Sequence, residues 1–207
     1  EAELCATVEA EGAALLKNQN AALPLAQGAK VSLFGHGSVD LMYGGTGSGS
    51  VDTSKAPNFK QALESQGISV NETLWNLYSS DSMMSKYSRM TPASISDTLE
   101  ANTQYAVNEA PWSALSSAES SFAEYGDAAI VVLSRSGGEG ADLPSGENGT
   151  NDSWISGQEG DGNYLALSAE ELELLQNLKA LKDNGTFKSI IVLLNSSNAI
   201  ELDFLNP

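Results

Sequence analysis

A single carboxylate in a glycine-rich turn is the residue of this sequence with the clearest capacity for chemistry. Glu139 lies in residues 134–142, which read SRSGGEGAD, and three glycines surround it. Glycines permit positive φ angles and let a second molecule approach the main chain closely. A carboxyl group held in such a turn can serve as a general acid or base. A lone acidic side chain in a loop is more commonly just solvated. The choice between a solvated and a catalytic Glu139 therefore depends on the rest of the sequence.

The turn follows a stretch that is typical of a buried strand. Residues 128–133, AAIVVL, have the length and the β-branched content of a strand, and residues 30–35, 68–70 and 188–195 suggest three more. Helical patterns separate these runs, so the order predicts an α/β fold with a mostly parallel, flavodoxin-like sheet flanked by helices. Ligands of such sheets bind at the carboxyl ends of the strands, and Glu139 would lie at one of those ends.

Several helices are predicted from their start and stop signals. Ser168 followed by Glu171 is a capping-box pattern that opens a helix, and Asn184-Gly185 ends it. The predicted core face of this helix consists of Leu172, Leu175, Leu178 and Leu181. Helices are also predicted over residues 1–17, 58–66 and 116–125, whereas the order of elements within residues 71–110 does not follow from the pattern.

Composition excludes several classes of function. The 27 acidic and 10 basic residues give a net charge of −17, which argues against nucleic acid or an anionic membrane as a partner. Cys5 and His36 are the sole residues of their types, so the sequence offers no thiolate or histidine-cluster metal site and no disulfide framework. No apolar run is long enough to suggest a membrane span. Acid–base chemistry in this chain would therefore fall to carboxylates.

A second glycine-rich stretch invites comparison with nucleotide-binding loops. Residues 43–51, YGGTGSGSV, have glycines at alternate positions, which is not the GxGxxG spacing of a dinucleotide site, and they lack the GK[ST] of a phosphate-binding loop. We therefore expect no nucleotide cofactor. The stretch is predicted to approach a ligand or a neighbouring domain closely; a flexible surface linker is the alternative.

The length of 207 residues suits one domain spanning residues 1–207. The chain begins at Glu1 and stops soon after an apolar segment, so we expect it to be a piece excised from a larger protein. The absence of paired cysteines fits a bacterial cytoplasmic location, with secretion as the alternative.

The landmarks above, in their order and spacing, closely resemble the C-terminal α/β-sandwich domain of glycoside hydrolase family 3, the β-glucosidases and β-xylosidases. The resemblance covers nearly the whole chain except residues 71–110 and part of 147–162. It rests on LLKN at 15–18 with LPL at 23–25, GGTGS at 44–48, SR at 134–135 leading to GEG at 138–140 and Asp142, YLALS at 164–168 with Glu170 or Glu171, and VLLN at 192–195.

The resemblance implies a three-layer sandwich and a role in catalysis. In that family a (β/α)8 barrel supplies an aspartate nucleophile, and this domain donates the general acid/base, which corresponds to Glu139. The substrate would be a β-glucoside or an oligosaccharide, the protein partner would be the barrel of the same chain, and no cofactor or metal is implied. Nothing in residues 1–207 looks like the barrel, so the chain alone is expected to be inactive.

The resemblance also suggests substrate-binding residues. Gly45 and Thr46 would border the leaving-group subsite, with Thr46 in place of a larger side chain of some relatives. Arg135 and Asp142 would orient Glu139 or bridge to the barrel, with an ordinary salt bridge as the alternative for each. Trp154 could stack on a sugar. Two other hypotheses remain open. One is a non-catalytic carbohydrate-binding or scaffolding domain of the same fold, and the other is a flavodoxin-like nucleotide binder, against which the glycine spacing and the negative charge count.

Overall fold

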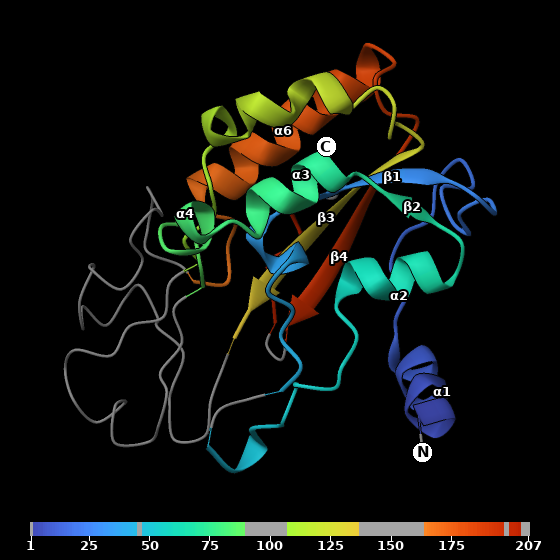
Figure 1. The fold of residues 1–207 in the computed structure, drawn as a ribbon, viewed down its shortest axis with the longest axis vertical. Helices are drawn as coiled ribbons and strands as arrows, with labels where there is room; N and C mark the ends of the chain where they lie inside the picture. Colours follow the sequence, from blue (N-terminus) through green and yellow to red (C-terminus); the bar gives the residue numbers. More distant parts are fainter. Residues whose placement is uncertain (1, 45–46, 90–106, 137–163, 197–198, 204–207) are drawn as a thin grey trace.

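Four parallel strands form the centre of the molecule (Figure 1). The structure, a computed structural model, describes residues 2–44, 47–89, 107–136, 164–196 and 199–203. The strands are β1 (Lys30–Phe34), β2 (Ser69–Val70), β3 (Ala128–Arg135) and β4 (Ile190–Ser196), and their order in the sheet is β2-β1-β3-β4. This is the order of the flavodoxin-like doubly wound sheet, so the predicted fold class is confirmed.

Burial of the strands explains their apolar sequences. Every residue of β3 is buried, because β3 pairs with β1 on one side and β4 on the other. The apolar run within residues 188–195 is typical of a strand that is covered on both faces, but this expectation is wrong for β4 among the described residues. This strand is an edge of the described sheet, its residues are mostly half-buried, and Leu193 is 39% exposed.

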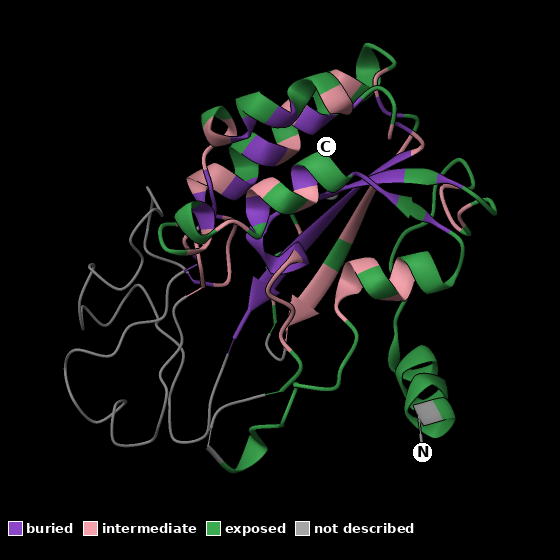
Figure 2. Ribbon diagram, in the orientation of Figure 1, coloured by how far each residue is buried: buried purple, intermediate pink, exposed green. Residues whose placement is uncertain are grey.

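Helices cover the two faces of the sheet unequally (Figures 1 and 2). One face carries α3 (Glu72–Tyr78), η3 (Trp112–Ser121) and α6 (Ala169–Asp183), which bury the larger apolar cluster. At its centre the Phe34 ring lies 5.2 Å from that of Phe122 and 5.7 Å from that of Phe187. The other face carries α2 (Phe59–Ser65), which packs on β1 and β2. The short α4 (Asp81–Met84) follows α3.

Local sequence explains where these helices begin. Asn58 and Ser168 each close a capping box, with Gln61 and Glu171 respectively, as the sequence predicts for α6. The predicted core face of α6 is partly wrong: Glu171, Leu174 and Leu178 are its buried residues, whereas Leu172 is 44% exposed. The capping carboxylate points inward, which rotates Leu172 toward solvent. The helix predicted over 116–125 is also shifted, since a 3-10 helix begins at Trp112, directly after Pro111.

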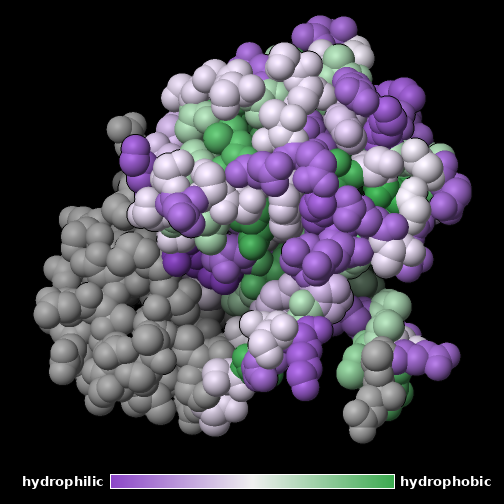
Figure 3. All heavy atoms as spheres, viewed as in Figure 1, coloured by the Kyte–Doolittle hydropathy of each residue, from purple (hydrophilic) through white to green (hydrophobic). Residues whose placement is uncertain are grey.

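The N-terminal segment lies apart from the sandwich (Figure 1). Helix α1 (Ala2–Gly12) is shorter than the predicted helix over 1–17, because the regular helix ends at a glycine, a residue with low helix propensity. Its apolar side chains are exposed, as are the two leucines that follow: Leu4, Val8, Leu15 and Leu16. Figure 3 shows hydrophobic residues at the surface in the region of α1. Within the described residues, no helix has the length and apolar character needed to cross a membrane.

Candidate functional site

Strands β1 and β3 are parallel neighbours: β1 ends beside Val131, and β3 continues for four more residues to Arg135. The connections that follow the two strands lead to opposite faces of the sheet. After β1 the chain leads to α2 on one face of the sheet, and after β3 it leads to α6 on the other. Doubly wound folds bind ligands in the crevice that such a switch opens. Gly35 makes the turn after β1 possible: its φ is 83°, and a Cβ there would lie 2.7 Å from the Val132 carbonyl oxygen. The short η1 (His36–Ser38) therefore lies directly against β3.

Arg135, the last residue of β3, is fully buried with all of its donors in use. Its guanidinium makes a bidentate pair with the Glu171 carboxylate, at 2.8 and 2.7 Å. Three backbone carbonyl oxygens accept its remaining bonds: that of Tyr164 from Nε at 2.7 Å, that of Ala166 from Nη2 at 2.6 Å and that of Ser134 from Nη1 at 2.9 Å. Five N–H groups is the full capacity of a guanidinium, so none is left for another partner.

Tyr164 makes a second connection at the same place. Its hydroxyl accepts a bond from the Ser136 backbone N–H at 3.1 Å and donates to the Ser136 carbonyl oxygen at 3.2 Å. The Arg135 guanidinium carbon lies 5.6 Å from the centre of the Tyr164 ring. Residues 135–136 and 164–166 are therefore joined side by side at the carboxyl end of β3.

Asn195 holds the backbone at Met42, just before the glycine-rich residues 43–51. From β4 its side-chain amide donates to the Met42 carbonyl oxygen at 3.0 Å, and its Oδ1 accepts from the Met42 backbone N–H at 2.6 Å. The Ser134 hydroxyl also donates to Oδ1, at 3.3 Å. Asn195 thus joins the chain just before Gly44 to the carboxyl ends of β3 and β4.

Asn195→Ala is expected to lower the free energy of unfolding by about 1–2 kcal/mol, because it leaves both backbone groups of Met42 without their half-buried partners. Urea titration measures this, and amide exchange at Met42 should become faster. Asn177→Ala is the matched control, since that amide donates to the Glu173 carbonyl on the exposed side of α6. Equal effects of the two substitutions would contradict the anchoring role of Asn195.

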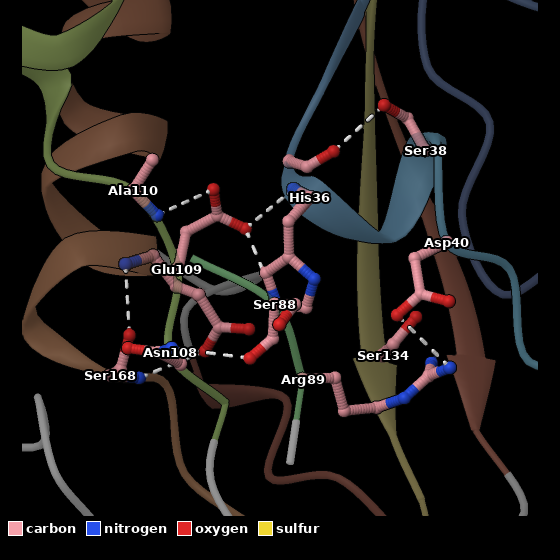
Figure 4. Close-up of polar contacts among 12 residues, drawn as sticks. His36, Ser38, Asp40, Ser88, Arg89, Asn108, Glu109, Ala110, Ser134 and Ser168 are labelled. Atoms are coloured by element: carbon pink, nitrogen blue, oxygen red, sulfur yellow. Dashed lines mark hydrogen bonds and ion pairs between the residues drawn. The ribbon is translucent and has the colours of Figure 1, made fainter. Parts of the chain in front are cut away.

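A buried acid lies behind η1 (Figure 4). The Glu109 carboxyl accepts bonds from the backbone N–H groups of His36 and Ala110, both at 2.9 Å, and its Oε2 lies 3.8 Å from His36 Nε2. Burial raises the pKa of Glu109 to about 8, against the opposing effect of the two N–H bonds. Burial, together with the nearby Arg89, lowers the pKa of His36 to about 4. Both side chains are therefore uncharged near neutral pH.

A cavity of about 400 Å³ lies beside the start of the glycine-rich stretch, lined by Tyr43, Gly44, Phe59 and the Asp40–Arg89 ion pair among others. The Asp40 and Arg89 side chains are 3.3 Å apart. No cluster of three or more metal-ligating side chains occurs among the described residues.

The comparisons with known proteins identify the family. Residues 13–207 match the glycosyl hydrolase family 3 C-terminal domain. The chain belongs to this family. It is similar to beta-glucosidase A of Butyrivibrio fibrisolvens, with 33% identity over 146 residues, which are 68% of this chain and 15% of that protein.

Solved structures of family 3 members have the same fold. Beta-glucosidase 3B of Thermotoga neapolitana, in complex with glucose, superimposes with a TM-score of 0.67 at 24% identity, over 98% of this chain and 25% of its own. A beta-glucosidase of Paenibacillus barengoltzii gives a TM-score of 0.67 at 25% identity, over 97% of this chain and 19% of its own. The family 3 domain thus spans a quarter or less of the length of these relatives.

The structure describes one of the six predicted site residues. Glu139, Gly45, Thr46, Asp142 and Trp154 lie outside the described residues. The sequence predicts substrate contact for Arg135, but in this family 3 domain the side chain is fully buried and all its donors are used internally. A role in orienting Glu139 stays a prediction.

The sequence does not single out three polar residues of this edge as functional candidates. Glu171 and Asn195 belong to the family resemblance without an assigned role in the site, and the sequence predicts only a helix cap for Glu171. Glu109 falls in the segment without clear elements. A polar residue that directly follows a fully apolar strand is a signal that could have singled out Asn195.

Proposed function

We propose that the chain is the acid/base-donating domain of a retaining β-glycosidase, with Glu139 as the acid/base and a β-glucoside or related oligosaccharide as the substrate. The observation that carries the proposal is the family match over residues 13–207. It is supported by the place of Glu139 in the chain, four residues beyond the end of β3 at the switch point of the sheet. That its named relatives are beta-glucosidases favours glucosides.

Retaining hydrolysis needs two carboxyl groups about 5 Å apart. One attacks the anomeric carbon, and the other first protonates the departing glycosidic oxygen and then removes a proton from the water that releases the sugar. In our proposal a barrel domain of the longer protein supplies the attacking carboxylate, and Glu139 carries the proton. A glycine-flanked carboxyl at a loop can reach across a domain boundary, which suits this division of roles.

Kinetics of Glu139→Gly in the full-length protein test the proposal. With poor aryl leaving groups we expect kcat/KM to fall about 10²–10⁴-fold, because their departure needs a proton. Activated aryl β-glucosides should still react with the enzyme quickly, and azide should restore turnover and give a β-glycosyl azide. Glu147→Gly is the control, since it removes another carboxylate of the same segment. Equal losses with all substrates and no response to azide would exclude Glu139 as the acid/base.

The second candidate function, a non-catalytic carbohydrate-binding or scaffolding domain, makes the opposite prediction for the full-length protein. In that case Glu139→Gly would leave hydrolysis of every substrate unchanged. The isolated chain is expected to hydrolyse no glucoside under either hypothesis, because the attacking carboxylate belongs to a different domain.

A further inference from the structure

We propose that the cavity beside Gly44 binds a neutral sugar ring. It lies between two stretches of chain: residues 38–44, which lead away from η1, and residues 50–59, which lead into α2. Arg89 also lines it. The inference goes beyond the proposed function, because it assigns a ligand to residues that have no part in the proposed acid/base step.

The walls of the cavity are connected to each other. The Tyr43 hydroxyl donates to the Pro57 carbonyl oxygen at 2.9 Å, which joins the two stretches. Asn195 holds the backbone at Met42, and the Asn58 side chain caps α2 where the second stretch ends. The volume of about 400 Å³ is within the range of about 300–1,000 Å³ that is usual for small-molecule sites. A ligand therefore meets walls that are already in place, which lowers the cost of ordering them.

The charged side chains of the cavity favour a neutral ligand. Asp40 and Arg89 are the sole charged residues among the described residues that line it, and their Oδ2 and Nη2 atoms lie 3.3 Å apart (Figure 4). The two charges are opposite and adjacent, so the lining has no net attraction for an anion or a cation. The chain as a whole carries a charge of −17, which disfavours anions further.

Asp40 is a suitable acceptor for a hydroxyl group. Its side chain is 32% exposed, against 11% for that of Arg89, so the carboxylate is the part of the ion pair that a ligand can reach. Within the described part of the chain, the ion pair is the only polar contact of this side chain, and it uses one of the two oxygens. Oδ1 is therefore left to accept a bond from a sugar hydroxyl. Ser50 and Thr53 add two hydroxyl-bearing side chains to the lining.

Two aromatic side chains give the cavity a surface for the ring of a sugar. Tyr43 and Phe59 both line it, and Tyr43 is 43% exposed. The C–H groups of a sugar ring are apolar and pack on aromatic side chains, whereas its hydroxyls need polar partners. A wholly apolar ligand would bury the free Asp40 oxygen without a donor, and an ion would leave the aromatic surface unused. The combination of the two surfaces fits a neutral sugar.

Titration of the 207-residue chain with methyl β-glucoside tests the inference. We expect saturable shifts of the amide resonances of Gly44 and Phe59, with a Kd on the order of 1 mM, because one sugar ring makes few contacts. Tyr43→Ala and Asp40→Ala should each weaken binding by about tenfold, since they remove the exposed ring and the acceptor. The charged analogue methyl β-glucuronide should bind more weakly than the glucoside.

Matched controls separate binding from general effects of substitution. Tyr125→Ala removes a half-buried tyrosine that lies beside Lys30, at the opposite end of β1, and Asp183→Ala removes an aspartate from an exposed ion pair of α6. Neither should change the Kd. Tyr43→Phe keeps the ring and loses only the bond to the Pro57 carbonyl, so it should bind better than Tyr43→Ala. It also provides a second variant if the alanine variant does not fold.

Several outcomes would overturn the inference. One is the absence of saturable shifts in the wild-type chain, as for a cavity that holds water alone. Others are equal Kd values for the wild type, Tyr43→Ala and Asp40→Ala, or a glucuronide that binds as tightly as the glucoside. The titration measures binding without hydrolysis, whereas the proposed function is tested by the hydrolysis rates of Glu139→Gly in the full-length protein, so either can fail alone.

Discussion

Glu171→Ala is expected to lower the free energy of unfolding of the chain by about 3–5 kcal/mol. The substitution leaves the Arg135 guanidinium in the interior without its counter-ion, and this side chain has no exposed surface. An arginine cannot relieve the burial by losing its proton, because the guanidinium stays charged in proteins. A domain of this size is commonly stable by about 5–15 kcal/mol, so the loss would range from about a fifth of the total to all of it. Urea unfolding followed by circular dichroism measures the difference.

A pair on the surface serves as the control for this substitution. Lys179 and Asp183 form an ion pair on the exposed side of α6, and both side chains are largely solvated. Asp183→Ala should change stability little, because water already surrounds the two charges. Arg135→Met combined with Glu171→Ala should cost less than the sum of the single substitutions, since neither charge is then left alone. If Glu171→Ala cost no more than Asp183→Ala, the guanidinium would have to be reached by water.

The strands of this fold could be predicted because burial on both faces removes polar positions from the sequence. Residues 128–133 contain no polar side chain, and they lie at the centre of the sheet. The same reasoning fails at β4, which has an equally apolar sequence but is an edge among the described residues. An apolar run indicates that a strand is buried in the complete fold. It does not identify the elements that cover the strand.

Local signals indicate the ends of α6 and three of the four leucines that face the core, but not the positions of Glu171 and Leu172. The capping box between Ser168 and Glu171 depends on neighbouring residues alone, so the sequence contains all of it. The second role of Glu171, as partner of Arg135, joins positions 36 residues apart and has no local pattern. That buried pair turns Glu171 inward and Leu172 outward, which reverses the choice that hydrophobicity alone suggests.

In the candidate site too, features with a local pattern could be predicted, whereas contacts between residues far apart in the sequence could not. Glu139 was found from its glycine-rich surroundings and the family resemblance, both of which are features of the sequence. The contact of Glu109 with the His36 backbone spans 73 positions, and its acid lies in a segment where no element was predicted. An acidic residue is expected at the surface, so nothing in the sequence marked this one as buried.

The stability of the chain is expected to fall by about 2 kcal/mol between pH 6.5 and 8 because of Glu109. Burial raises its pKa in the folded state to about 8, from an ordinary value of 4.5. Its contribution to stability is therefore complete below pH 4.5 and is lost as the pH rises through 8. His36 has the opposite shift, to about 4 from 6.5, so its contribution is complete above pH 6.5 and is lost as the pH falls through 4. The two slopes cancel between pH 4.5 and 6.5, and above 6.5 only that of Glu109 remains.

Glu109→Gln isolates this effect, because an amide has nearly the shape of a protonated carboxyl group and does not titrate. The variant loses one of the two bonds from the His36 and Ala110 N–H groups, so its stability is lower at every pH. Its urea midpoint should nevertheless stay level from pH 6.5 to 8, whereas that of the wild type falls. His36→Gln should keep the decline above pH 6.5 and lose the compensation below it. A wild-type decline that persisted unchanged in Glu109→Gln would assign the titration to another group, and Glu109 would then have to be ionised in the interior at neutral pH.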